Sequence, residues 1–210
     1  MRRSRNPQAP AHFCSFTLLG NLASALDNLF MRLFVGIPLA DAVIAELSAI
    51  SARLRSGGNG LRWTASGSWH ITLEFLGDTS REQYECIVAQ LHKLHLRSVP
   101  IRLEELGCFD RAGVFFADVK VSHELLLLQR RVIAATADCG FVYEARPYQP
   151  HITLAHSKDQ RQRLSKLKDR IGSQPKFSSF VTGDFLLYES FLGPSGSRYE
   201  IRQHFRLDGR

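Results

Sequence analysis

Short apolar runs alternate with longer apolar stripes of helical spacing along most of this chain. The runs predict strands over residues 32–38, 70–77, 99–107, 113–119, 151–154, 180–190 and 198–207. Apolar residues three and four positions apart predict helices over residues 43–54, 84–94, 125–135 and 164–171. This mixture of strands and helices indicates an α+β fold.

Each predicted helix follows a pattern that commonly starts helices. Asp41 and Ser122 are predicted as N-caps, because their short side chains carry an oxygen that can accept a hydrogen bond from the first turn. Thr79-x-x-Glu82 and Ser157-x-x-Gln160 match the capping box. These signals fix where we expect the helices to begin.

One tetrapeptide, His-Ile-Thr-Leu, occurs at residues 70–73 and again at residues 151–154, which are 151 − 70 = 81 positions apart. The same offset relates Phe34 to Phe115 and Asp41 to Ser122. The repeated unit is therefore a strand, a helix and a histidine-bearing strand, and it is duplicated. Two such copies predict two pseudo-symmetric lobes, each an antiparallel-rich sheet with flanking helices, around a central cleft.

The repeated strand presents a defined set of chemical groups. Side chains alternate between the two faces of a strand, so His70 and Thr72 share one face, as do His151 and Thr153. An imidazole can give or take a proton near neutral pH, and a hydroxyl can donate a hydrogen bond to an anionic oxygen. A single such histidine is more simply explained as a structural residue. Two identical copies favour acid–base chemistry on a phosphoryl group.

Composition limits the possible classes of protein. The 210 residues are 44% hydrophobic and 22% charged, which is typical of a globular protein, and no apolar run approaches the ~20 residues of a membrane span. The net charge of +7 permits an anionic partner such as nucleic acid. The four cysteines form no C-x-x-C pair, so we expect reduced thiols in a cytoplasmic protein.

The first thirty residues differ from the rest in pattern. They contain arginines, prolines and a mildly apolar stretch that polar residues interrupt, which argues against a signal peptide despite the small residues Ala23-Ser24-Ala25. We interpret residues 1–30 as an extension that the fold can dispense with. Residues 31–210 then form the two-lobed domain.

Two further features leave alternatives open. Trp63, Trp69 and Tyr148 flank the histidine motifs, where they can pack between elements or stack on nucleobases. The helix predicted after the second motif carries many basic residues between residues 158 and 170. A solvated face is the simpler explanation of that helix, and contact with an RNA backbone is the alternative.

With both motifs assigned, the sequence resembles the two-histidine phosphoesterase superfamily. It is most similar to the bacterial RNA 2',3'-cyclic phosphodiesterases, historically called 2'-5' RNA ligases. The resemblance rests on residues 32–37, on Trp63 ahead of residues 70–77, and on residues 146–155. It implies a bilobal fold without metal or cofactor, and hydrolysis of RNA 2',3'-cyclic phosphate ends to 2'-phosphomonoesters.

Roles for single residues follow from in-line displacement at phosphorus. His70 and His151 are the predicted catalytic pair, and Thr72 and Thr153 are the predicted ligands of the non-bridging oxygens. From the mechanism we assign His70 as proton donor and His151 as proton acceptor. The family commonly has arginine five positions after the second histidine, where this chain has His156, so we expect His156 to contact substrate.

Other functions stay open at this point. They are a 2'-5' RNA ligase, a 2'-5' oligonucleotide phosphodiesterase, and a non-catalytic module that binds RNA ends. We expect the protein to act as a monomer.

The repeat predicts that the domain does not need the extension. A chain that starts at Met31 should fold and keep the activity of the full chain, because the first strand begins there. Circular dichroism and turnover of a 2',3'-cyclic nucleotide measure both properties. An insoluble or inactive truncation would show that the extension packs on the domain.

Overall fold

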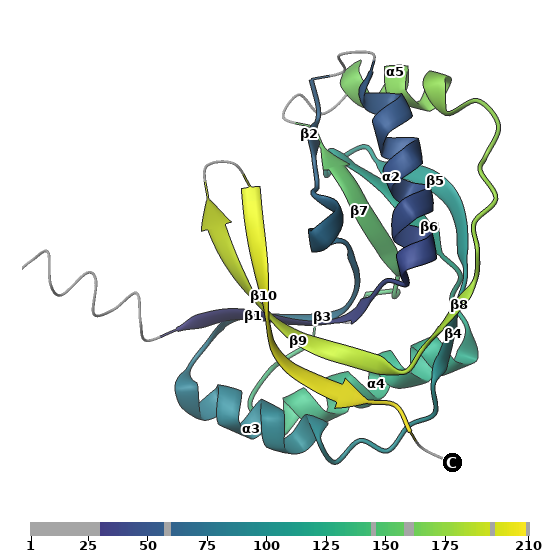
Figure 1. The fold of residues 1–210 in the computed structure, drawn as a ribbon. Coiled ribbons are helices and arrows are strands. Elements are labelled where there is room, and N and C mark those ends of the chain that lie inside the picture. Colours follow the sequence, from purple (N-terminus) through teal and green to yellow (C-terminus); the bar gives the residue numbers. More distant parts are fainter. Residues whose placement is uncertain (1–29, 57–59, 144–145, 158–161, 194–195, 209–210) are drawn as a thin grey trace, which may run out of the picture.

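The computed structural model describes residues 30–56, 60–143, 146–157, 162–193 and 196–208. Nearly all of the predicted extension therefore lies outside the described residues. The described part is a mixture of antiparallel sheets and helices, and the α+β prediction is confirmed (Figure 1).

Two four-stranded antiparallel sheets carry the two histidine motifs. Sheet A has the strand order β10-β9-β1-β3, with β10 at Gly196–Arg206, β9 at Asp184–Gly193, β1 at Met31–Pro38 and β3 at His70–Thr79. Sheet B has the order β2-β7-β6-β5, with β2 at Arg62–Trp63, β7 at His151–His156, β6 at Val114–Val119 and β5 at Leu103–Phe109. Strands β4 at Val99–Ile101 and β8 at Phe180–Thr182 pair separately.

Two of the helices, α2 and α4, cross from one lobe to the other (Figure 1). The helices are α2 at Asp41–Arg55, α3 at Arg81–Leu91, α4 at His123–Ala137 and α5 at Gln162–Ile171, with a short 3-10 helix η1 at Ser66–Ser68. Helix α2 follows β1 of sheet A but lies beside sheet B, whereas α4 follows β6 of sheet B and lies with α3 along sheet A (Figure 1). A buried hydrogen bond of 2.8 Å from the Thr136 hydroxyl of α4 to the Glu74 carboxylate of β3 fixes this crossing.

The helix starts agree with the sequence in part. The Ser122 hydroxyl accepts a hydrogen bond from the Leu125 N–H, as predicted. The other two predicted starts that can be compared are wrong by one residue. Helix α2 has Ala40 as its N-cap, so Asp41 lies inside the first turn. There its negative charge still interacts favourably with the positive end of the helix dipole.

The capping box before α3 is formed by Ser80 and Gln83. Thr79 is fully buried at the end of β3, and its hydroxyl donates to the Gly77 carbonyl, which removes it from the helix start. The predicted box at Ser157-x-x-Gln160 lies largely outside the described residues.

Two predicted strands are each split in two. Residues 99–107 form β4 and β5, which belong to different sheets and separate at Arg102, whose carbonyl accepts a hydrogen bond from the Lys120 N–H. Residues 180–190 fall into β8 and the longer β9. In both cases the apolar pattern continues through the break, because both halves contribute to the same core.

The predicted duplication is present, with a difference of one residue in strand pairing. Pro38 lies opposite His70 in sheet A, and Asp118 lies opposite His151 in sheet B. These partners are 118 − 38 = 80 residues apart, whereas the histidines are 81 apart. The two histidines consequently face different residues across their ladders.

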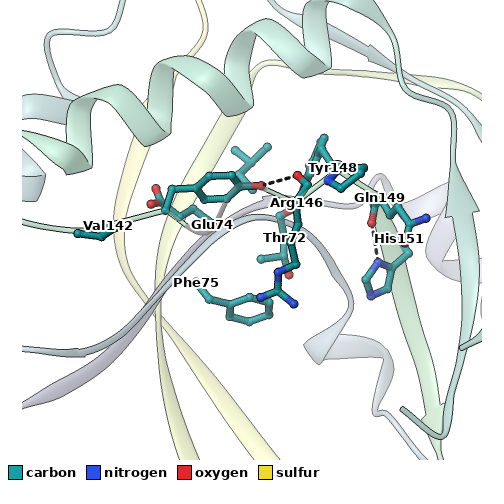
Figure 2. A pocket seen from close by; sticks show the side chains of 11 residues that line it. Thr72, Glu74, Phe75, Val142, Arg146, Tyr148, Gln149 and His151 are labelled. Atoms are coloured by element: carbon teal, nitrogen blue, oxygen red, sulfur yellow. Dashed lines mark hydrogen bonds between the residues drawn. The ribbon is translucent and has the colours of Figure 1, made fainter. Parts of the chain in front are cut away.

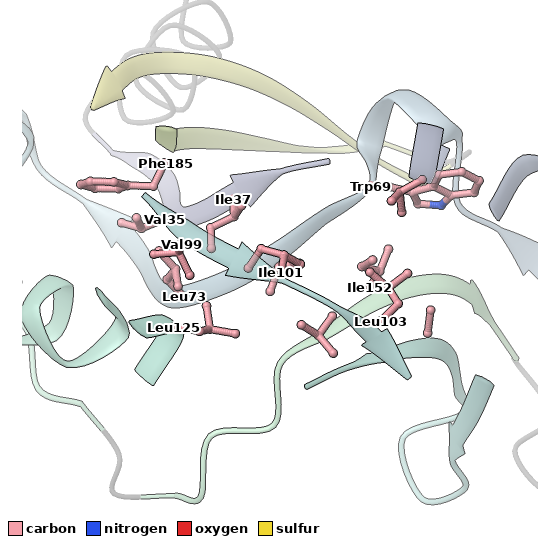
Figure 3. Close-up of a cluster of buried hydrophobic side chains, with 14 of the residues drawn as sticks. Val35, Ile37, Trp69, Leu73, Val99, Ile101, Leu103, Leu125, Ile152 and Phe185 are labelled. Atoms are coloured by element: carbon pink, nitrogen blue, oxygen red, sulfur yellow. The ribbon is translucent and has the colours of Figure 1, made fainter. Parts of the chain in front are cut away.

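One hydrophobic core joins the lobes. Side chains of sheet A such as Val35, Ile37 and Leu73 and side chains of sheet B such as Ile152 belong to one cluster of buried residues (Figure 3). Ile71 and Ile152, the residues after the two histidines, are both fully buried. The apolar face of each histidine strand therefore anchors its polar face in position.

The expectation of reduced thiols is wrong for two cysteines. Cys86 of α3 and Cys139, just after α4, form a disulfide across 53 residues of sequence. Cys108 lies outside the bridge. The pairing depends on how α3 and α4 pack under sheet A, so the spacing of the cysteines could not reveal it.

The disulfide predicts a specific contribution to stability. Replacing Cys86 and Cys139 together by serine should lower the free energy of unfolding by about 2–4 kcal/mol, because the unfolded chain regains the freedom of the closed loop. Urea unfolding measures this, with Cys108→Ser as the control that keeps the bridge. An unchanged unfolding midpoint in the double variant would contradict a bridge in the native protein.

Candidate active site

The histidine strands present their side chains as the sequence predicts. His70, Thr72, His151 and Thr153 are all partly exposed. The isoleucine and leucine between and after them are 0–2% exposed in both copies. One face of each strand is thus held by the core, and the other presents an imidazole and a hydroxyl.

A hydrogen bond to the backbone orients each imidazole. His70 Nδ1 lies 2.9 Å from the Ser68 carbonyl oxygen, and His151 Nδ1 lies 2.8 Å from the Gln149 carbonyl oxygen. A carbonyl can only accept, so Nδ1 carries the hydrogen in both rings and Nε2 is left for other partners. The two carbonyls are 149 − 68 = 81 residues apart, as the histidines are, so the duplication includes this bond.

His70 lies among aromatic rings. Its ring centroid is 4.6 Å from that of Phe34, 5.2 Å from that of Tyr199 and 5.7 Å from that of Tyr188. Burial lowers the pKa of His70 to about 4, the hydrogen bond to the Ser68 carbonyl opposes this, and the charge of His151 lowers the pKa further. The neutral form of the His70 ring is therefore favoured, and the two rings are close enough to interact.

His151 has a different neighbourhood. Phe109 and Phe116 contact its ring edge-on, with centroids 5.0 Å and 5.5 Å away. Asp118 lies directly opposite His151 in the β6–β7 ladder, and residues so paired share one face of a sheet. Burial raises the pKa of the Asp118 carboxyl, and His151 opposes that rise. A carboxylate thus lies beside His151, whereas Pro38, which has no charge, lies beside His70.

A pocket of about 470 Å³, here called the dyad pocket, opens between β3 and the segment that leads into β7, and His151 is the motif histidine that lines it. Figure 2 shows Thr72 and Phe75 of β3 facing Arg146, Tyr148 and His151 from the other repeat. The Tyr148 hydroxyl donates to the Thr72 carbonyl at 2.9 Å, and burial raises the pKa of Tyr148, so this donor keeps its proton. This hydrogen bond holds the segment that precedes the second histidine motif against β3, the strand that carries the first motif.

Each histidine strand contains a bulge that changes which side chains face the cleft. The ladder register shifts beside Leu73 in β3 and beside Leu154 in β7, so two consecutive buried residues follow each threonine. His156 therefore returns to the face of His151, although regular alternation would turn it away. Its partner in the other copy, at 156 − 81 = 75, is Phe75, which is 76% exposed.

The aromatic residues near the motifs have separate roles. Trp69 is 6% exposed and belongs to the core. Trp63 packs edge-on against Phe115 and carries the guanidinium of Arg55 over its ring at 5.2 Å. Phe75 was not singled out from the sequence, because its exposure depends on the bulge.

Among the described residues, no group of three or more His, Cys, Asp or Glu side chains could hold a metal ion. No helix in the described ranges has the length and apolar character needed to span a bilayer.

The fold and site define a class, the two-lobed phosphoesterases with one histidine motif in each lobe. The structure of Escherichia coli LigT in its apo form superposes with a TM-score of 0.70 at 21% identity, covering 85% of this chain and 98% of that chain. That of TT0787 from Thermus thermophilus has a TM-score of 0.71 at 26% identity, with 86% and 100% covered.

The chain belongs to the 2'-5' RNA ligase superfamily, whose sequence profile matches residues 39–188. Among curated relatives, the RNA 2',3'-cyclic phosphodiesterase of Archaeoglobus fulgidus is 28% identical over 173 residues, covering 81% of this chain and 97% of the relative. The protein of the same name from Thermotoga maritima is 26% identical over 185 residues, covering 85% and 97%. The family inferred from the two motifs is thus confirmed.

Proposed function

We propose that the protein hydrolyses RNA 2',3'-cyclic phosphate ends to 2'-phosphomonoesters without a metal ion. The observation that carries this proposal is the repeated imidazole, tied through Nδ1 to a carbonyl, beside a threonine in each facing strand. Hydrolysis needs a base for water, an acid for the leaving oxygen and donors for the phosphate. The name shared by the curated relatives supports the same reaction.

The surroundings of the two rings support roles opposite to those assigned from the sequence. A neutral ring is needed to accept a proton from water, and burial favours the neutral form at His70. An acid is needed to protonate the leaving oxygen, and the Asp118 carboxyl lies opposite His151 in its ladder, whereas the uncharged Pro38 lies opposite His70. We therefore assign His70 as the base and His151 as the acid.

The proposed step is an in-line displacement at phosphorus. Water attacks the phosphorus atom and gives a proton to Nε2 of His70. The bond from phosphorus to the 3'-oxygen breaks, and Nε2 of His151 gives its proton to that oxygen. The hydroxyls of Thr72 and Thr153 donate to the non-bridging oxygens, which carry the developing charge. The product retains its phosphate on the 2'-oxygen.

The dyad pocket supports a role in holding the terminal nucleoside. Phe75 of β3 offers an exposed ring, and the Arg146 guanidinium from the other repeat faces it in the pocket (Figure 2). Aromatic and guanidinium planes are common platforms for unpaired bases. A nucleobase between them would leave the cyclic phosphate next to Thr72 and His151.

A 2'-5' ligase uses the same groups with a different nucleophile. An RNA 5'-hydroxyl would replace water in attack on the cyclic phosphate, and the 3'-oxygen would leave as before. The family name favours keeping this second activity. Both rings come from one chain, so we propose that a monomer suffices for the reaction. We propose that it acts on RNA in the cytoplasm.

Replacing either histidine tests the reaction. His70→Ala and His151→Ala should each lower kcat by about 10²–10⁴-fold, the usual contribution of a general acid or base. Turnover of a 2',3'-cyclic nucleotide in the presence of EDTA measures this, and His95→Ala is the matched surface control. Near-complete turnover by either folded variant would sink the assignment. If the wild-type protein bound RNA ends but did not hydrolyse the cyclic phosphate, a non-catalytic module that binds RNA ends would be favoured instead.

The assigned roles also predict a pH profile. The acid limb of kcat/KM should lie well below pH 6.5, because the base His70 has its pKa lowered to about 4 and stays neutral above that value. Asp118→Asn should lower kcat, because it removes the carboxyl that lies opposite the proposed acid His151 in the β6–β7 ladder. Asp138→Asn is the control. A kcat unchanged by Asp118→Asn would contradict this role for Asp118.

A further inference from the structure

A second pocket, the basic pocket, lies on the His70 side of the site. It encloses about 300 Å³ between the end of sheet B and the β9–β10 hairpin. Its lining joins the site through Ser68, whose carbonyl accepts from His70, and through Tyr199, whose ring contacts His70 edge-on. A chain bound at the histidines can therefore continue directly into this pocket.

Three basic residues line the basic pocket, and none of its lining residues is acidic. They are Arg62 of β2, His156 of β7 and Arg198 of β10. Arg62 lies opposite His156 in the β2–β7 ladder, so their side chains share one face. Burial lowers the pKa of His156, and the charge of Arg62 lowers it further. His156 is thus favoured as a neutral donor beside an arginine that always stays charged.

The two arginines of the basic pocket differ in whether a nearby carboxylate neutralises their charge. Arg198 forms an ion pair with Glu200 and stacks over Phe191 at 4.7 Å. Arg62 is exposed and forms no ion pair within the described part of the chain. Arg62 is therefore the residue whose charge a bound anion would neutralise.

The opposite flank of the site would repel an anion. A pocket beside His151 is lined by Glu104, Glu105 and Asp118, with Lys120 as its single basic residue. The charge on the two flanks differs in sign, so a polyanion that crosses the histidines is directed toward Arg62 and His156.

We propose that the basic pocket binds the backbone phosphate on the 5' side of the terminal nucleoside, with Arg62 and His156 as its ligands. This inference rests on the proposed function and adds to it that the substrate is a strand of at least two nucleotides. Arginine suits the role of phosphate ligand, because its planar fork can hold two phosphate oxygens.

The test compares a nucleoside 2',3'-cyclic phosphate, which has no 5'-phosphate, with a dinucleotide ending in the same cyclic phosphate. The wild-type ratio of kcat/KM, dinucleotide over nucleoside, should fall about tenfold in Arg62→Ala. His156→Ala should lower the ratio by less, since it removes a neutral donor. Arg81→Ala on α3 is the control and should keep the wild-type ratio. A ratio unchanged in Arg62→Ala, or equal losses on both substrates, would overturn the proposal.

A binding measurement separates this inference from the reaction itself. Fluorescence anisotropy of a labelled trinucleotide that ends in a 2'-phosphate needs no turnover. The slope of log Kd against log salt concentration should fall by about 0.7 in Arg62→Ala, the value for one phosphate contact in a single strand. If wild type hydrolysed neither substrate, the proposed function would fail, and an unchanged slope would overturn the phosphate subsite independently.

Discussion

The hydrogen bond from each imidazole Nδ1 to the carbonyl two residues earlier is the constraint on which the site depends. A carbonyl only accepts, so the bond fixes the tautomer and also the direction of the ring. Because Ser68 and Gln149 supply these carbonyls from equivalent positions, duplication of the strand duplicates the oriented ring. Crossing helices and a shared core then hold the two strands face to face.

The two copies have diverged in what surrounds the same motif. A one-residue difference in pairing puts Pro38 opposite His70 and Asp118 opposite His151. Among the described residues, tyrosine rings contact the first histidine ring and phenylalanine rings alone contact the second, and burial at the first favours the neutral imidazole. A symmetric pair of histidines can in this way become one base and one acid, which is what displacement at phosphorus requires.

Local patterns predicted most of the strands, the helices and the faces of the histidine motifs, because alternation and helical spacing act over a few residues. What they missed depends on contacts between distant segments. The bulges that turn Phe75 and His156 toward the cleft leave no mark in residue type. The bridge from Cys86 to Cys139 follows from the packing of α3 on α4. The pairing of Asp118 with His151 follows from the register of the β6–β7 ladder. The repeat offset of 81, applied to Pro38, would instead place Val119 opposite His151.

Nuclear magnetic resonance of the His70 ring tests the central claim most directly. In protein labelled with ¹⁵N in histidine, His70→Ala identifies the His70 signals by their loss. The account predicts a neutral ring with hydrogen on Nδ1 that persists as the pH falls through 6.5, because the pKa is lowered to about 4. A ring that gains its second proton near pH 6.5, or a neutral ring with hydrogen on Nε2, would contradict it.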